Sequence, residues 1–299
     1  MKLDIVAYEG EAGKPVVVFI HGLGMDKDIW INPSASKILG GMFPLKVLLK
    51  RYAAEGDHGT LRTLFDIVRQ KGYTVVTWSQ KRPAGTIGPA VLELQEVVRI
   101  VCGKDQGPIF LIGHSRGGLV ARKYLSTTDR PVRALITLST PHHGSSIAGL
   151  ARHVAPIASL LAPVIPKGEK GTLRFALRRV LEFLRSRALR EILPGSAFFK
   201  SLDDKPGDGI YSVSFGGTSP SLFTLSGVAV PDIFEKIVPA GLFPEEMKPG
   251  KGDGLVSAES SKLPWCHEHH LFALNHAEIL FDEGVHDRVV GIIEDIARG

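Results

Sequence analysis

The sequence has little cysteine and no long hydrophobic run, and each shortage excludes a class of protein. Two cysteines in 299 residues, Cys102 and Cys266, cannot form the disulfide framework of a small secreted domain. We expect two reduced thiols, with a single disulfide as the alternative. No run approaches the roughly 18 apolar residues of a membrane span, and the first residues lack the apolar segment of a signal peptide. These features favour a cytoplasmic protein, or a secreted one without its leader.

Most of the chain also has little net charge, because its positive and negative residues nearly balance. The net charge is +5, and the segment between Lys167 and Arg190, with eight Lys or Arg and two Glu, carries +6 by itself. The remainder is therefore close to neutral, which argues against a broad nucleic-acid surface. A dinucleotide-binding loop is absent as well, because "GLGMDKD" lacks the third glycine of that motif.

Short apolar runs alternate with helical patterns, which is typical of an α/β protein with a mostly parallel sheet flanked by helices. Strands are expected at Pro15–Gly22, Tyr73–Gln80, Pro108–His114, Val132–Thr140, Gly209–Gly217 and His269–Asn275. Helices are expected at about Thr60–Lys71, Ile87–Cys102, Gly117–Ser126 and Val285–Arg298.

Two segments interrupt this alternation. Met25–Arg51 reads as a long excursion with short helices, and residues 144–204 are far longer than a crossover between strands needs. The second segment is expected to be a helical cap inserted into a single domain that spans residues 1–299. Its sequence carries an apolar and a basic stripe, formed by Leu177, Leu181, Leu184 and Ala188 and by Arg174, Arg178 and Arg185. These stripes fit a solvated amphipathic helix or a mobile lid with an apolar underside.

Ser115 is the candidate nucleophile. It lies in "GHSRG", a G-x-S-x-G motif that follows an apolar strand and opens a helix, as a nucleophile elbow requires. Small residues such as Gly113 and Gly117 leave room for the helix to cross close to the strand. The alternative is a glycine-rich turn in which the serine only caps the helix.

A serine hydroxyl needs a base, usually a histidine that a carboxylate orients. His276 is the candidate base because it follows the last expected strand, at the edge of the sheet where the nucleophile strand also ends. Asp253 is the candidate acid, since it lies between the last two strands. Asp208 sits at the wrong end of its strand. Other candidate histidines after Ser115 are His142 and His143, just beyond the next strand, and His267, His269 and His270, on or before the last strand.

Acyl transfer also requires hydrogen-bond donors for the developing oxyanion. The backbone N–H of Arg116, directly after the serine, is one candidate. The backbone N–H of Leu23, in the loop "HGLG", is the other. His21 is expected to brace that loop rather than to react.

Several motifs together resemble those of bacterial triacylglycerol lipases and esterases of the α/β-hydrolase superfamily. "FIHGLG" is similar to their oxyanion loop, "GHSRGG" to their nucleophile elbow, and "LSTPHHGS" to the segment that leads into their lid. "YSVSFGGTSP", "GDGLVS" and "NHAEI" are similar to the end of the Pseudomonas and Burkholderia lipases. "HGLG" and "TPHHGS" are also similar to features of the GPI-inositol deacylases. The resemblance implies the α/β-hydrolase fold.

The resemblance has implications for metals. No cofactor is required, but the similar lipases hold calcium with two carboxylates, and Asp232 and Glu278 occupy roughly similar places. The disulfide that some of those lipases carry near "GDGLV" has no counterpart. The cluster Cys266–His270 contains zinc-ligand residue types, but adjacent strand residues point to opposite faces of a sheet.

The sequence therefore predicts a serine ester hydrolase, an esterase or lipase, that works through an acyl-enzyme. Its partner would be a small-molecule or lipid ester, with transient contact between the cap and a lipid interface. An acyltransferase that uses the same acyl-enzyme, a phospholipid or GPI-type deacylase, and a non-catalytic binding protein of the same fold are the alternatives.

Overall fold

The computed structural model describes most of the chain. The described residues are 2–38, 61–102, 107–147, 149, 186–202, 209–221, 224–225, 228–229 and 243–298. Asp208, Asp232, the end of the Met25–Arg51 excursion and most of the expected cap at 144–204, including its stripes up to Arg185, lie outside them.

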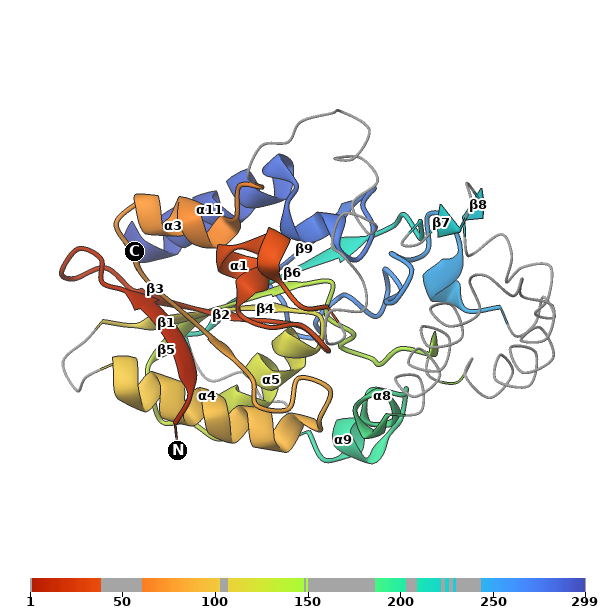
Figure 1. Cartoon of the computed structure of the whole chain (residues 1–299), viewed down its shortest axis with the longest axis horizontal. Coiled ribbons are helices and arrows are strands. Elements are labelled where there is room, and N and C mark those ends of the chain that lie inside the picture. Colours follow the sequence, from red (N-terminus) through yellow and green to blue (C-terminus); the bar gives the residue numbers. More distant parts are fainter. Residues whose placement is uncertain are drawn as a thin grey trace, which may run out of the picture.

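A seven-stranded sheet forms the centre of the molecule (Figure 1). Its strands, in spatial order, are β1 (Asp4–Tyr8), β3 (Thr74–Ser79), β2 (Val16–Ile20), β4 (Ile109–His114), β5 (Val132–Leu138), β6 (Tyr211–Gly217) and β9 (Glu268–Phe272). All neighbours pair in parallel except β1, which runs antiparallel to β3. The predicted α/β class with a mostly parallel sheet is confirmed.

Strand β1 is not among the strands expected from the sequence. It is a five-residue edge strand, and all of its residues are at least partly exposed. A continuous apolar run predicts a strand that is covered on both faces, and an edge strand does not need one. The pairing of Asp4 with Ser79 and of Tyr8 with Val75 fixes its register.

Helices cover both faces of the sheet (Figure 1). One face carries α1 (Asp28–Ile31), α3 (Leu64–Gln70) and α11 (Glu283–Arg298), and the other carries α4 (Ile87–Val101), α5 (Arg116–Leu125), α8 (Arg187–Glu191) and α9 (Ala197–Lys200). Short 3-10 helices η1 (Pro33–Ala35), η4 (Glu245–Met247) and η5 (Glu278–Leu280) and a small hairpin of β7 (Thr224–Leu225) and β8 (Val228–Ala229) complete the described elements. Within the described ranges, every helix is too short or too polar to span a bilayer.

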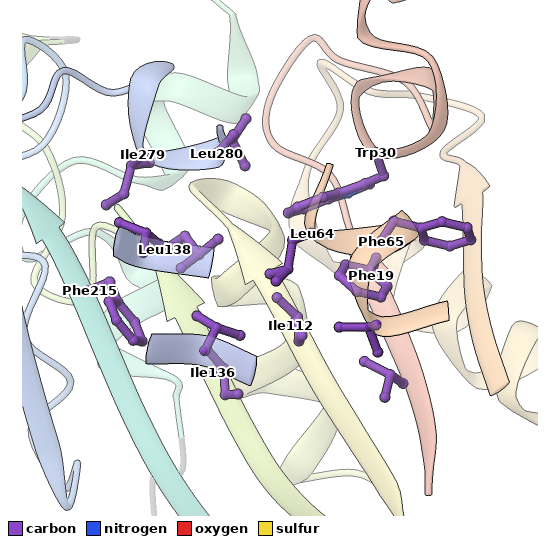
Figure 2. Close-up of a cluster of buried hydrophobic side chains, with 14 of the residues drawn as sticks. Phe19, Trp30, Leu64, Phe65, Ile112, Ile136, Leu138, Phe215, Ile279 and Leu280 are labelled. Atoms are coloured by element: carbon purple, nitrogen blue, oxygen red, sulfur yellow. The ribbon is translucent and has the colours of Figure 1, made fainter. Parts of the chain in front are cut away.

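Alternate side chains of β2, β3, β4 and β5 enter two separate hydrophobic clusters. In β2, Val17 and Phe19 belong to the cluster under α1, α3 and α11, whereas Val16, Val18 and Ile20 belong to the cluster under α4 and α5. Figure 2 shows the first cluster, in which strand residues meet the helical side chains Trp30, Leu64, Phe65, Ile279 and Leu280. Burial on both faces explains the near-continuous apolar strand sequences.

Phe19→Ala should destabilise the fold strongly, because Phe19 is fully buried and its ring lies 5.2 Å from the rings of both Trp30 and Phe65. Loss of a buried phenylalanine leaves a cavity, so the free energy of unfolding should fall by about 3–5 kcal/mol in urea titrations. Leu92→Ala is the control, because Leu92 is 64% exposed and its loss should cost no more than about 0.5 kcal/mol. Equal losses in the two variants would contradict this packing.

Candidate active site

Ser115 occupies a tight turn between β4 and α5. Its backbone angles are φ 53° and ψ −128°, and among the described non-glycine residues only Ser139 shares a positive φ. A Cβ at Gly113 would lie 2.5 Å from the backbone of Gly118, and one at Gly117 would lie 2.3 Å from the carbonyl oxygen of Ile20. Glycine is therefore required on both sides of the serine. Between Ile109 and Arg122, Ser115 is the one residue that is partly exposed rather than buried.

Asp253 and His276 meet in the structure. His276 Nδ1 lies 2.9 Å from Asp253 Oδ2, and the side chains are 5% and 0% exposed. The other carboxylate oxygen, Oδ1, accepts hydrogen bonds from the backbone N–H groups of Leu255 (2.9 Å) and Val256 (2.7 Å). A carboxylate only accepts, so in the neutral imidazole Nδ1 carries the hydrogen and Nε2 is left with a lone pair. The bond to Asp253 thus orients the imidazole, and Nε2 is available as a proton acceptor.

His114 links the nucleophile strand to the loop that carries His276. The two imidazole rings are 4.8 Å apart, and His114 Nε2 donates to the carbonyl oxygen of His276 at 3.0 Å. The backbone N–H of His276 also donates to the carbonyl oxygen of Asp253 at 3.0 Å. Among the described residues, no hydrogen bond joins the Ser115 hydroxyl to His276. Catalytic hydrogen bonds often shorten only when substrate binds, so both groups stay candidates.

The two candidate oxyanion donors lie on segments that touch each other. A Cβ at Gly22 would lie 3.1 Å from Ser115 Cβ, which places the "HGLG" loop beside the serine. That loop turns at Gly24, whose φ is 70°, and the N–H of Gly24 donates to Pro83. Arg116 is the first residue of α5, where backbone N–H groups have no partner within the helix. The N–H groups of Leu23 and Arg116 make no backbone hydrogen bond within the described residues.

His21 is fully buried, and both of its ring nitrogens are occupied. Nε2 accepts from the N–H of Gln80 at 3.0 Å, so Nδ1 carries the hydrogen and donates to the carbonyl oxygen of Gly22 at 3.0 Å. Burial lowers the pKa of His21 to about 4, so the ring is neutral at pH 7. These contacts fit a brace for the loop.

Of the two calcium candidates, Glu278 lies within the described residues and Asp232 lies outside them. Glu278 is buried and accepts a hydrogen bond from the N–H of Asn275 at 3.0 Å. In the Cys266–His270 segment, His267 and His269 contact the hydroxyls of Ser212 and Ser214, and His270 pairs with Glu268. No group of three or more potential ligands occurs among the described residues.

Polar side chains that were not expected from the sequence support the site from a distance. Glu246 is buried and accepts from the N–H and the hydroxyl of Ser146, at 2.6 and 2.7 Å, which ties the loop before Asp253 to the start of the expected cap. The side chains of Gln80 and Arg116 are hydrogen-bonded to each other at 2.5 Å. These contacts join residues 100 and 36 positions apart, and a single sequence carries no signal for them.

The fold and the site together define an alpha/beta hydrolase. The model of the alpha/beta hydrolase family matches residues 17–282, so the chain belongs to this family, as its motifs suggested. Among solved structures, the chain is similar to the mature form of the Bacillus licheniformis lipase BlEst2, with a TM-score of 0.57 and 18% identity over 97% of both chains. The propeptide form of that lipase gives a TM-score of 0.58 and 16% identity over 97% of this chain and 53% of that chain. No match to a curated protein was found.

Three buried histidines should make the protein sensitive to mild acid. Burial lowers the pKa of His21 to about 4 and holds the pKa values of His114 and His142 well below 6.5. The unfolded chain binds these protons below pH 6.5 and the folded chain does not, so stability present above pH 6.5 is lost as the pH falls. The shift of His21 from 6.5 to about 4 corresponds to about 3 kcal/mol.

Urea unfolding at pH 7.5 and pH 5 measures this loss. Unfolding free energy should be lower at pH 5, and His21 alone should account for about 2 kcal/mol of the loss, because pH 5 lies about 1.5 units below its ordinary pKa of 6.5. His267→Gln is the control, because His267 is exposed and does not act on the three buried rings, so its removal should leave the pH dependence largely unchanged. Equal stability at the two pH values would show that these rings are not buried in the neutral form.

Proposed function

We propose that the protein is a serine hydrolase of carboxylic esters. The observation that carries the proposal is the buried Asp253–His276 hydrogen bond, which His114 links to the strand that ends at Ser115, a partly exposed serine in a strained strand-to-helix turn. Strained backbone angles concentrate at functional sites, and a buried acid–imidazole pair is the standard activating device for a serine. The similarity to a solved structure described as a lipase points in the same direction.

In the proposed mechanism, Ser115 attacks the ester carbonyl while His276 Nε2 takes its proton. Asp253 holds the imidazole orientation and stabilises the imidazolium. The N–H groups of Leu23 and Arg116 bind the tetrahedral oxyanion, and His276 then returns its proton to the leaving alcohol. Water activated by His276 cleaves the acyl-enzyme. No step in this scheme uses a metal, and the calcium candidates Asp232 and Glu278 have no assigned part in it.

Ser115→Ala should remove turnover and leave the fold intact. Without its hydroxyl no acyl-enzyme forms, so kcat on p-nitrophenyl esters should fall by at least about 1000-fold. The matched control is Ser139→Ala, which removes the hydroxyl of the other serine with a positive φ. Its kcat should remain within about twofold of the wild type. Near-normal turnover by Ser115→Ala would refute the proposal.

The proposed substrates are esters with long acyl chains. Apolar sequence in the expected cap, such as "IAGLARHVAPIASLLAPVIP", suits a lipid-like acyl group. Accordingly kcat/KM on p-nitrophenyl esters should rise from acetate towards longer acyl chains, and emulsified triglyceride should be hydrolysed with a rate increase above its solubility limit. A preference for acetate without such an increase would indicate an esterase for small soluble substrates.

Product analysis with added alcohol separates hydrolysis from acyl transfer.

A further inference from the structure

The side chain of Arg116 is fully buried, although its backbone adjoins the serine. Its guanidinium reaches the loop between β3 and α4. Nη1 donates to Gln80 Oε1 at 2.5 Å, and Nη2 donates to the carbonyl oxygen of Thr86 at 2.7 Å. Two bonds from one planar group fix both the position and the rotation of this side chain.

Gln80 continues the chain of hydrogen bonds to the other side of the site. Its amide Nε2 donates to the carbonyl oxygen of His21 at 3.1 Å, and its backbone N–H donates to His21 Nε2 at 3.0 Å. His21 in turn donates to the carbonyl oxygen of Gly22, the residue before Leu23. Continuous hydrogen bonds therefore connect the two segments that carry the candidate oxyanion donors.

Carboxylates on two helices compensate the buried charge. Desolvation lowers the pKa of Arg116 to about 10, while Glu191 on α8 and Glu93 on α4 oppose that shift, so the guanidinium is protonated at neutral pH. Glu191 accepts from the N–H of Ile87 at 2.7 Å, next to Thr86. Glu93 accepts from Trp78 Nε1 and from the N–H of Lys81, each at 3.2 Å. The network is thus anchored on elements that do not belong to the nucleophile turn.

We infer that Arg116 and Gln80 are positioning residues that hold the backbone N–H groups of Leu23 and Arg116 at the spacing an oxyanion requires. The inference rests on the proposed function, because it assigns a role to those N–H groups. Oxyanion donors act by preorganisation, and their benefit depends on donor distances of about 2.7–3.1 Å to the developing charge. If the loop shifted relative to the start of α5, stabilisation of the transition state would decrease more than substrate binding would.

The competing explanation is that these groups only stabilise the fold. A stability role predicts a lower melting temperature and fewer active molecules, with unchanged kcat for each active molecule. A positioning role predicts a lower kcat for each active molecule at nearly constant KM. Titration of the reactive serine with a p-nitrophenyl phosphonate counts active molecules and separates the two.

Gln80→Glu is the sharpest variant. The carboxylate can still accept from Arg116, but it can no longer donate to the carbonyl oxygen of His21, so only one link of the network is broken. Arg116→Met removes both guanidinium bonds, and Arg116→Lys keeps the charge without the planar fork. The control is Arg122→Met, which removes another buried arginine of α5, one that donates to the carbonyl oxygen of His142 at 2.8 Å.

We expect kcat per titrated serine to fall about tenfold in Gln80→Glu and about 100-fold in Arg116→Met, with Arg116→Lys between wild type and Arg116→Met. KM should stay within about twofold, and the affinity for a trifluoromethyl ketone, which mimics the tetrahedral adduct, should fall in parallel with kcat. Arg122→Met should keep its kcat per titrated serine.

Unchanged kcat per titrated serine in Gln80→Glu and Arg116→Lys would overturn the inference, and these two variants decide it if Arg116→Met does not fold. An equal loss in Arg122→Met would also overturn it, since the effect would then come from general loosening of α5. Failure of the proposed function gives a different result, because Ser115→Ala would then retain activity or the phosphonate would not label wild-type protein.

Discussion

The close approach of the first turn of α5 to strands β2 and β4 is the constraint on which the site depends. A Cβ at Gly117 would lie 2.3 Å from Ile20 O of β2, and one at Gly113 of β4 would lie 2.5 Å from the backbone of Gly118. This contact forces the chain to reverse sharply at Ser115, whose φ of 53° is unfavourable for a residue with a side chain. Such strain costs about 1–3 kcal/mol and persists only where the surrounding packing fixes the backbone. The two hydrophobic clusters provide that packing.

The sheet also explains why residues far apart in the sequence meet at one edge. The parallel strands β4, β6 and β9 end on the same side, so the loops that follow them lie close together. Main-chain hydrogen bonds fix the conformation of the loop that carries His276. It is bonded to His114 through one carbonyl and to the Asp253 backbone through one N–H. The orientation of the imidazole is thus set by main-chain contacts as well as by the Asp253 carboxylate.

The parts of this structure that sequence can predict are those with a local or periodic signal. Buried strands such as β2 and β4 have continuous apolar runs, and their predicted positions agree with the structure to within two residues. The exposed edge strand β1 has no such run. The motif around Ser115 and the order of residues along the sheet edge point to Asp253 and His276 without any structure. The hydrogen bond between Gln80 and Arg116 depends on the directions that two long side chains take in the folded protein, and no local sequence pattern predicts those directions.

The buried guanidinium of Arg116 is the least expected of these features, because an apolar residue of similar volume is often as stable in such a position or more so. Burying a charge requires fixed partners, and here they come from the loop after β3, from α4 and from α8. An apolar side chain at this place would still pack if the start of α5 shifted against its neighbours. The two hydrogen bonds of the planar guanidinium are directional, so both can form at only one relative position of α5 and the loop after β3. Arg116 therefore costs desolvation energy and restricts the start of α5 to one placement against the loop that holds Leu23. Such a restriction matters where the relative placement of two backbone segments must be held to within fractions of an ångström, and the proposed oxyanion donors of Leu23 and Arg116 are such a case.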